Sequence, residues 1–218
     1  MSSISHLIES WRKEQLDRAA RVKIQPLSPI PRFVAGADCA FAADKKSIFA
    51  VAVVYDRVEQ KVVEIARDHR PLTVPYVPGY LSFREGAAVL AAIGKLKHEF
   101  GVVCFDGQGM AHPRRCGLAT HLGIELDMPA VGMAKSVLCG EFTEPKAEAG
   151  SISPLIHKDE TVGWVLRTRA NVKPIFLSVG HRIDLPSAKA LAMACLTRYR
   201  IPEPTRQADI EVARFKKA

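Results

Sequence analysis

The stretch from Val102 to Arg115 holds residue types that bind metal ions and phosphates directly after an apolar run. Four apolar residues lead to Asp106, and two glycines, a histidine and two arginines follow it. Such a run predicts a strand buried on both faces, which places the carboxylate at the edge of a sheet. Because open α/β sheets bind ligands beyond the carboxyl ends of their strands, we expect chemistry here. An ordinary strand-to-loop turn would explain the same residues equally well.

Two further carboxylates bear on this choice. Asp38 stands in an apolar segment, where an unpaired charge is costly, so it needs a partner or a metal ion. Glu85 follows Ser82 at the spacing of a helix capping box, which would explain it without a metal. If these two converge with Asp106, their hard oxygens suit Mg²⁺ or Mn²⁺. A pair of such ions can stabilise the attacking and leaving oxygens of phosphodiester hydrolysis.

Four other side chains are candidates for a role in catalysis or binding. Lys135 follows a run of small and apolar residues and could reach a phosphate, although a solvated strand end explains it equally well. His112 and His181 lie beside glycine-marked loops and basic residues and could shuttle a proton, although loop histidines more often do not. Tyr76 lies in a proline-rich segment that should expose two tyrosines. It could insert into a base stack, or it could simply pack on its own loop.

The elements that position these side chains follow the order β-β-β-α-β-α-β. Hydrophobic periodicity predicts strands at 33–41, 47–55, 61–67, 102–105 and 130–134, with helices at 82–100 and 116–124. The first three strands have short connections, which indicates an antiparallel meander.

The remaining segments are expected to be less regular. They are an N-terminal segment over 1–25 that is helical from residue 3 to about 20, loops over 136–160, a hairpin over 161–179, a helix over 185–199 started by Asp184 or Ser187, and a basic C-terminal tail over 200–218. No repeat or long linker divides the chain, so we predict a single domain over 1–218.

Composition restricts the class of protein and its compartment. The formal net charge of +8 favours a polyanionic partner. Five cysteines stand singly, which argues against a disulfide framework or a structural zinc site and fits a reducing cytoplasm. No segment has the composition of a membrane span or of a signal peptide. Nothing indicates an oligomer, and we expect a cytoplasmic monomer.

Seven groups of residues occur in the same order as the motifs of one known family. They are Pro75-Tyr76-Val77-Pro78-Gly79, Leu81-Ser82-Phe83-Arg84-Glu85, Asp106-Gly107-Gln108-Gly109 with His112-Pro113-Arg114, Gly117-Leu118-Ala119 with His121-Leu122-Gly123, Gly132-Met133-Ala134-Lys135, Gly180-His181-Arg182-Ile183 and Pro202-Glu203-Pro204-Thr205-Arg206-Gln207-Ala208-Asp209. Through them the chain resembles endonuclease V from about residue 33 to 209. One departure is Asp184, where the family commonly has serine; both residues cap helices.

The resemblance implies an α/β, ribonuclease-H-like fold, in which a mixed sheet of three antiparallel strands followed by parallel strands is flanked by helices. It also implies a Mg²⁺-dependent endonuclease, with Mn²⁺ able to substitute, that acts on deoxyinosine in DNA and initiates repair. Family members hydrolyse the second phosphodiester bond on the 3′ side of the lesion and leave 3′-hydroxyl and 5′-phosphate ends. Some relatives prefer inosine in RNA.

The resemblance further implies roles for single residues. Asp38, Glu85 and Asp106 look like metal ligands and catalytic carboxylates, Lys135 like a phosphate contact, and His181 like a further catalytic group. Tyr76 looks like a wedge that fills the gap left by an extruded base. The implied wall of the base pocket consists of Pro78, Gly79, Leu81, Gly107, Gly109 and His112.

Base selection can be argued from chemistry. Hypoxanthine offers an N1–H donor and an O6 acceptor where adenine has an acceptor and a donor, so paired backbone groups could select it. A tight glycine-lined pocket could exclude guanine by its 2-amino group. The partner that the resemblance implies is inosine-containing DNA, with RNA as the alternative. Two other hypotheses are a ribonuclease-H-like nuclease with another target and a basic binding module without catalysis.

Overall fold

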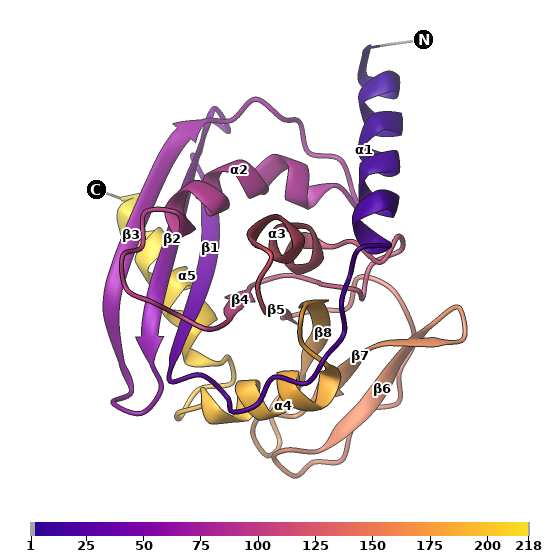
Figure 1. The fold of residues 1–218 in the computed structure, drawn as a ribbon, viewed down its shortest axis with the longest axis vertical. Helices are drawn as coiled ribbons and strands as arrows, with labels where there is room; N and C mark the ends of the chain where they lie inside the picture. The colour runs from indigo at the N-terminus through magenta and orange to yellow at the C-terminus, as the bar shows by residue number, and fades with distance from the viewer. Residues whose placement is uncertain (1–2, 218) are drawn as a thin grey trace.

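The computed structural model describes residues 3–217, which build one eight-stranded sheet with helices on both faces (Figure 1). The strands are β1 (Phe33–Phe41), β2 (Ser47–Asp56), β3 (Lys61–Pro71), β4 (Val103–Phe105), β5 (Ala130–Ala134), β6 (Ile152–His157), β7 (Glu160–Leu166) and β8 (Ile175–His181). The helices are α1 (Ser3–Ala19), α2 (Leu81–Ile93), α3 (Leu118–Leu126), α4 (Leu185–Ala194) and α5 (Glu203–Phe215). No helix within the described range is long and apolar enough to cross a bilayer.

The sheet has a parallel centre between two antiparallel parts, in the order β3-β2-β1-β4-β5-β8-β7-β6. The predicted meander of β1, β2 and β3 is confirmed, and β1, β4 and β5 are parallel. β8, β7 and β6 continue the sheet with antiparallel pairing. Ala37 lies opposite Phe105, and Phe105 lies opposite Gly132. The residues that follow β4 and β5 therefore leave the sheet at the same end, next to Asp38 of β1.

Side chains along the central strands alternate between two core layers. Ala37 and Phe105 pack with α2 and α3 on one face, whereas Cys104 packs with α4 on the other. Val51 packs with α5 on that second face. α5 lies beside β1 and β2 (Figure 1). Asp38, next to Ala37, therefore points toward the face that α5 covers.

The structure confirms the helix at one end of the chain and corrects the other end. α1 (Ser3–Ala19) matches the helix expected from residue 3 to about 20 within the segment 1–25, of which residues 1–2 lie outside the described range. The basic tail expected over 200–218 is wrong, because α5 packs there with Ala208 and Val212 buried against β1 and β2. These two residues are four positions apart, which is the spacing of one face of a helix.

Other boundaries also differ from the sequence pattern. The stretch expected to be rich in loops contains β6, an edge strand that accommodates Pro154. The hairpin predicted over 161–179 is confirmed as β7 and β8. Asp184 caps α4 by accepting a hydrogen bond from the Ser187 N–H at 2.8 Å, but the helix ends at Ala194.

Candidate active site

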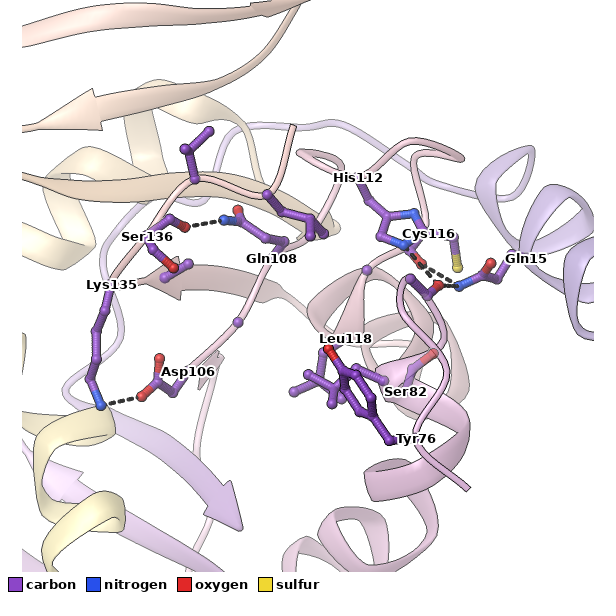
Figure 2. A pocket seen from close by; sticks show the side chains of 17 residues that line it. Gln15, Tyr76, Ser82, Asp106, Gln108, His112, Cys116, Leu118, Lys135 and Ser136 are labelled. Atoms are coloured by element: carbon purple, nitrogen blue, oxygen red, sulfur yellow. Dashed lines mark hydrogen bonds and ion pairs between the residues drawn. The ribbon is translucent and has the colours of Figure 1, made fainter. Parts of the chain in front are cut away.

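Asp38, Asp106 and Lys135 meet where the parallel strands end. The register of β1 and β4 places Asp106, which follows β4, beside Asp38. Lys135 follows β5, and its Nζ lies 2.5 Å from Asp106 Oδ2 (Figure 2). Burial lowers the pKa of Lys135, but the hydrogen bond and charge of Asp106, together with the charges of Asp209 and Asp38, outweigh this effect and leave the pKa raised. The structure thus brings two predicted carboxylates together with a lysine whose positive charge they favour.

Asp209 is a further member of this cluster that the sequence reasoning missed. It lies in α5 with its side chain 53% exposed, and its Oδ2 lies 3.4 Å from Lys135 Nζ. Its charge also raises the pKa of Asp38. A signal was available, since Asp209 ends the last of the seven matched segments and follows buried Ala208. Because the segment 200–218 was expected to be a tail, no sequence pattern placed the Asp209 carboxylate against the sheet.

Glu85 approaches the cluster from α2. The capping interpretation is wrong, because Tyr80 is the N-cap residue, makes no side-chain cap hydrogen bond, and leaves Ser82 inside the helix. Burial raises the pKa of the Glu85 carboxyl to about 7, while a hydrogen bond from the Cys39 thiol lowers it and the charge of Asp106 raises it. A buried carboxylate without a capping role needs another explanation.

The chemistry of the carboxylates fits a divalent cation. Burial and the charge of Asp106 raise the pKa of Asp38 to about 8, although the Cys39 N–H donates a hydrogen bond to Asp38 Oδ1 at 2.8 Å. A hard cation such as Mg²⁺ relieves the repulsion between such carboxylates. Within residues 3–217, however, no three acidic, histidine or cysteine side chains are arranged to hold a metal ion, and Lys135 is paired with Asp106. The donor types fit a metal, and its binding requires these side chains to rearrange.

A cavity of about 380 Å³ opens beside Asp106 and Lys135 (Figure 2). The predicted pocket residues that line it are Gly79, Leu81, Gly107 and His112. Tyr76 also lines it and is 67% exposed, so an aromatic ring stands where the cavity meets solvent. The cavity therefore connects the carboxylate cluster with a wall that includes two glycines, Gly79 and Gly107, and an exposed aromatic ring.

His112 lines this cavity as a neutral, fixed imidazole. Burial and the charge of Arg114 lower its pKa to about 4. The Arg114 N–H lies 3.2 Å from His112 Nδ1, so this nitrogen accepts, and Nε2 donates to the Gly79 carbonyl at 3.0 Å. Since both ring nitrogens are engaged, the geometry favours a structural role over proton transfer.

Three of the predicted site residues lie elsewhere. β8 runs antiparallel to β5, so His181 lies opposite Ala130, at the end of β5 remote from Lys135. The assignment of His181 to the catalytic group is therefore wrong; it accepts from the Lys23 N–H at 3.3 Å and faces Asp127.

Gly109 and Pro78 are not part of the cavity wall either. A Cβ on Gly109 would lie 2.1 Å from the Val179 carbonyl oxygen, so this glycine permits close packing against β8. Pro78 is exposed. Tyr80, expected to be exposed, is buried against Trp11.

The fold and the site define a class of protein: α/β enzymes in which carboxylates gather where parallel strands end, beside a ligand-sized cavity. The family model for endonuclease V matches residues 16–210. The chain belongs to the endonuclease V family, and it is therefore a hydrolytic endonuclease.

Individual relatives support this membership. The chain is 49% identical to an endonuclease V of Nostoc punctiforme over 178 residues, which cover 82% of this chain and 80% of that protein. The crystal structure of endonuclease V from Streptomyces avermitilis matches with a TM-score of 0.91 and 42% identity, covering 96% of this chain and 92% of that one. Endonuclease V of Ciona intestinalis, solved with a DNA containing an inosine followed by a ribo-adenosine, matches with a TM-score of 0.85 and 28% identity. That match covers 97% of this chain and 98% of the Ciona chain.

Proposed function

We propose that the chain is a metal-dependent endonuclease that recognises deoxyinosine in DNA and hydrolyses the second phosphodiester bond on its 3′ side. The products would carry 3′-hydroxyl and 5′-phosphate ends and would enter repair. One observation carries the proposal: Asp106 and Lys135 line the same cavity as Gly79 and His112. An extruded base in this cavity would lie beside the groups that act on the strand. The inosine in the DNA bound by the Ciona relative supports this choice of base.

We infer that Asp38, Glu85 and Asp106 hold Mg²⁺, with Mn²⁺ able to replace it, and that Asp209 assists them. When bound, the metal would supply an activated water and stabilise charge that develops on the phosphate. Lys135 offers a fixed positive charge beside Asp106, suited to a phosphate oxygen.

The cavity wall supports recognition through the backbone. Gly79 and Gly107 present no side chain, which lets a base approach their backbone closely. Because three donors within the protein already engage the Gly79 carbonyl, we assign the contacts with the base to the Gly79 N–H and to the N–H and C=O groups of Gly107. Hypoxanthine presents N1–H and O6 to such groups, where adenine presents the opposite pattern. The 2-amino group of guanine requires additional space, which a tight wall denies.

The overall architecture fits this proposal. We infer a ribonuclease-H-like fold, because the antiparallel meander of β1 to β3 is followed by parallel β4 and β5. We further propose a single-domain monomer over 1–218 in the cytoplasm, which the five free cysteines support.

An endoribonuclease specific for inosine is the second candidate. The observation that favours it is the ribo-adenosine that follows the inosine in the DNA bound by the Ciona relative. Competition between matched DNA and RNA strands, each with one inosine, distinguishes the two activities by the strand that is cut first.

Nicking of an inosine duplex by Asp38→Asn and Asp106→Asn tests the site assignment. We expect both variants to bind the duplex but to nick it at least about 100-fold more slowly than the unmodified enzyme. We also expect EDTA to stop nicking by the unmodified enzyme. Asp159→Asn changes an exposed carboxylate and serves as the control. Wild-type rates in either site variant would contradict the assignment.

A further inference from the structure

Gln15 of α1 is a buried polar residue whose side chain contacts the wall of the cavity. It is 1% exposed and lines the cavity. Its Nε2 donates to the Gly79 carbonyl at 3.0 Å and to the Cys116 carbonyl at 3.1 Å (Figure 2). Its Oε1 accepts from Arg114 Nε at 2.5 Å. Both Nε2 hydrogens and the amide oxygen are therefore engaged, which fixes the orientation of the side chain.

The Gly79 carbonyl accepts hydrogen bonds from three directions. Besides Gln15, His112 Nε2 donates to it at 3.0 Å and Arg114 Nη2 at 2.7 Å. Gly79 has a φ of +79°, a conformation that a residue with a side chain rarely adopts. The three donors hold this peptide in one orientation, and with it the backbone that faces the cavity.

Aromatic packing holds α1 in place around this contact. The Trp11 ring stacks on Phe83 of α2 with centroids 5.0 Å apart and lies 5.7 Å from Tyr80. The Arg114 guanidinium lies over the Tyr80 ring, 4.3 Å from its centroid. The loop that carries Gly79 is thus held between α1 and the segment after β4, and the family match begins only at residue 16.

We propose that Gln15 is a positioning residue for base selection: it orients the Gly79 peptide and so sets the preference of the cavity for inosine. This inference rests on the proposed function. Gln15 belongs to the N-terminal helix, so α1 is part of the recognition site rather than an appendage. A residue that only stabilises the fold would affect all strands equally, whereas a residue that positions the pocket affects the lesion strand alone.

Two substitutions of Gln15 test this role. Gln15→Glu keeps the shape and the Arg114 contact but points a carboxylate at two carbonyls, and Gln15→Met removes all three hydrogen bonds. Asp17→Asn, at an exposed position of the same helix, is the control. The readouts are affinities for a strand with one inosine and for the matched adenine strand, at a temperature where circular dichroism shows every variant folded.

We expect either Gln15 variant to bind the inosine strand about 10-fold more weakly while its affinity for the adenine strand and the affinities of the control stay unchanged. If the ratio of the affinities for the inosine and adenine strands stays unchanged in both variants, whether or not both affinities fall, the inference is overturned. Absence of any inosine preference in the unmodified enzyme would instead refute the proposed function.

Discussion

At the scale of one residue, Asp38 is a proposed metal ligand whose burial opposes the stability of the fold. The carboxyl has a pKa raised to about 8 by burial and by Asp106, against about 3.9 in an unfolded chain. Between these values the folded protein holds a proton that the unfolded chain has released. Stability therefore falls as the pH rises through this window, unless a cation compensates the charge.

Asp38→Asn should therefore stabilise the metal-free protein at high pH. In EDTA we expect the variant to gain on the order of 2–4 kcal/mol over the unmodified chain at pH 8 and much less at pH 5. Thermal or urea unfolding at both pH values measures this difference, with the exposed Glu9→Gln as control. A gain that does not grow with pH would show that the buried charge of Asp38 is not the cause.

Tyr76 allows a separate test of the exposed side of the cavity. If its exposed ring fills the gap left by an extruded base, Tyr76→Ala should weaken binding of an inosine duplex by about 10-fold and of an inosine single strand much less. Tyr76→Phe keeps the ring and should retain the affinity. Equal losses of Tyr76→Ala on duplex and single strand would exclude a wedge.

At the scale of elements, α5 connects the site to the core. It carries Asp209 toward Lys135 while Val212 packs against β1 and β2. The helix is therefore part of the domain, and its packing determines where Asp209 stands.

Val212→Ala tests this packing. The loss of two buried methyl groups should destabilise the protein by roughly 1–3 kcal/mol. Chemical denaturation measures the change, and Lys216→Ala, at an exposed position just after the same helix, should stay within about 0.5 kcal/mol of the unmodified chain. A Val212 variant as stable as this control would indicate that α5 does not depend on the contact.

The sequence predicts elements well where a hydrophobic pattern stands alone. β2 and β4 are continuous apolar runs and appear as expected. β6 was missed because Pro154 and exposed residues interrupt its pattern, and α5 because charged residues surround its narrow buried stripe.

The candidate site was only partly predictable for a different reason. Topology alone brings Asp106 and Lys135 together, because each directly follows one of two adjacent parallel strands. The position of His181 depends on the direction of β8, and that of Asp209 on the packing of α5, and neither is set by local sequence. Gln15 contacts residues 64 and 101 positions away, which no local pattern encodes.

At the scale of the whole molecule, the net charge of +8 predicts how salt acts on binding. Contacts of Lys and Arg with phosphates release counterions, so affinity for any DNA strand should fall steeply between about 50 and 200 mM salt. The preference for inosine over adenine should stay constant, because the contacts proposed between the cavity wall and the base are made by neutral groups. Fluorescence anisotropy over this range measures both quantities, and a preference that disappears with salt would contradict recognition by the cavity.

We propose that the cavity and the carboxylate cluster form one site, with the base in the cavity and the cut at the cluster. Mapping of cuts at nucleotide resolution, in matched duplexes that carry one inosine or one adenine, tests it most directly. We expect a single cut at the second phosphodiester bond 3′ of the inosine, dependent on Mg²⁺, and no cut in the adenine duplex. Cuts placed without regard to the inosine, or cuts that persist in EDTA, would contradict it.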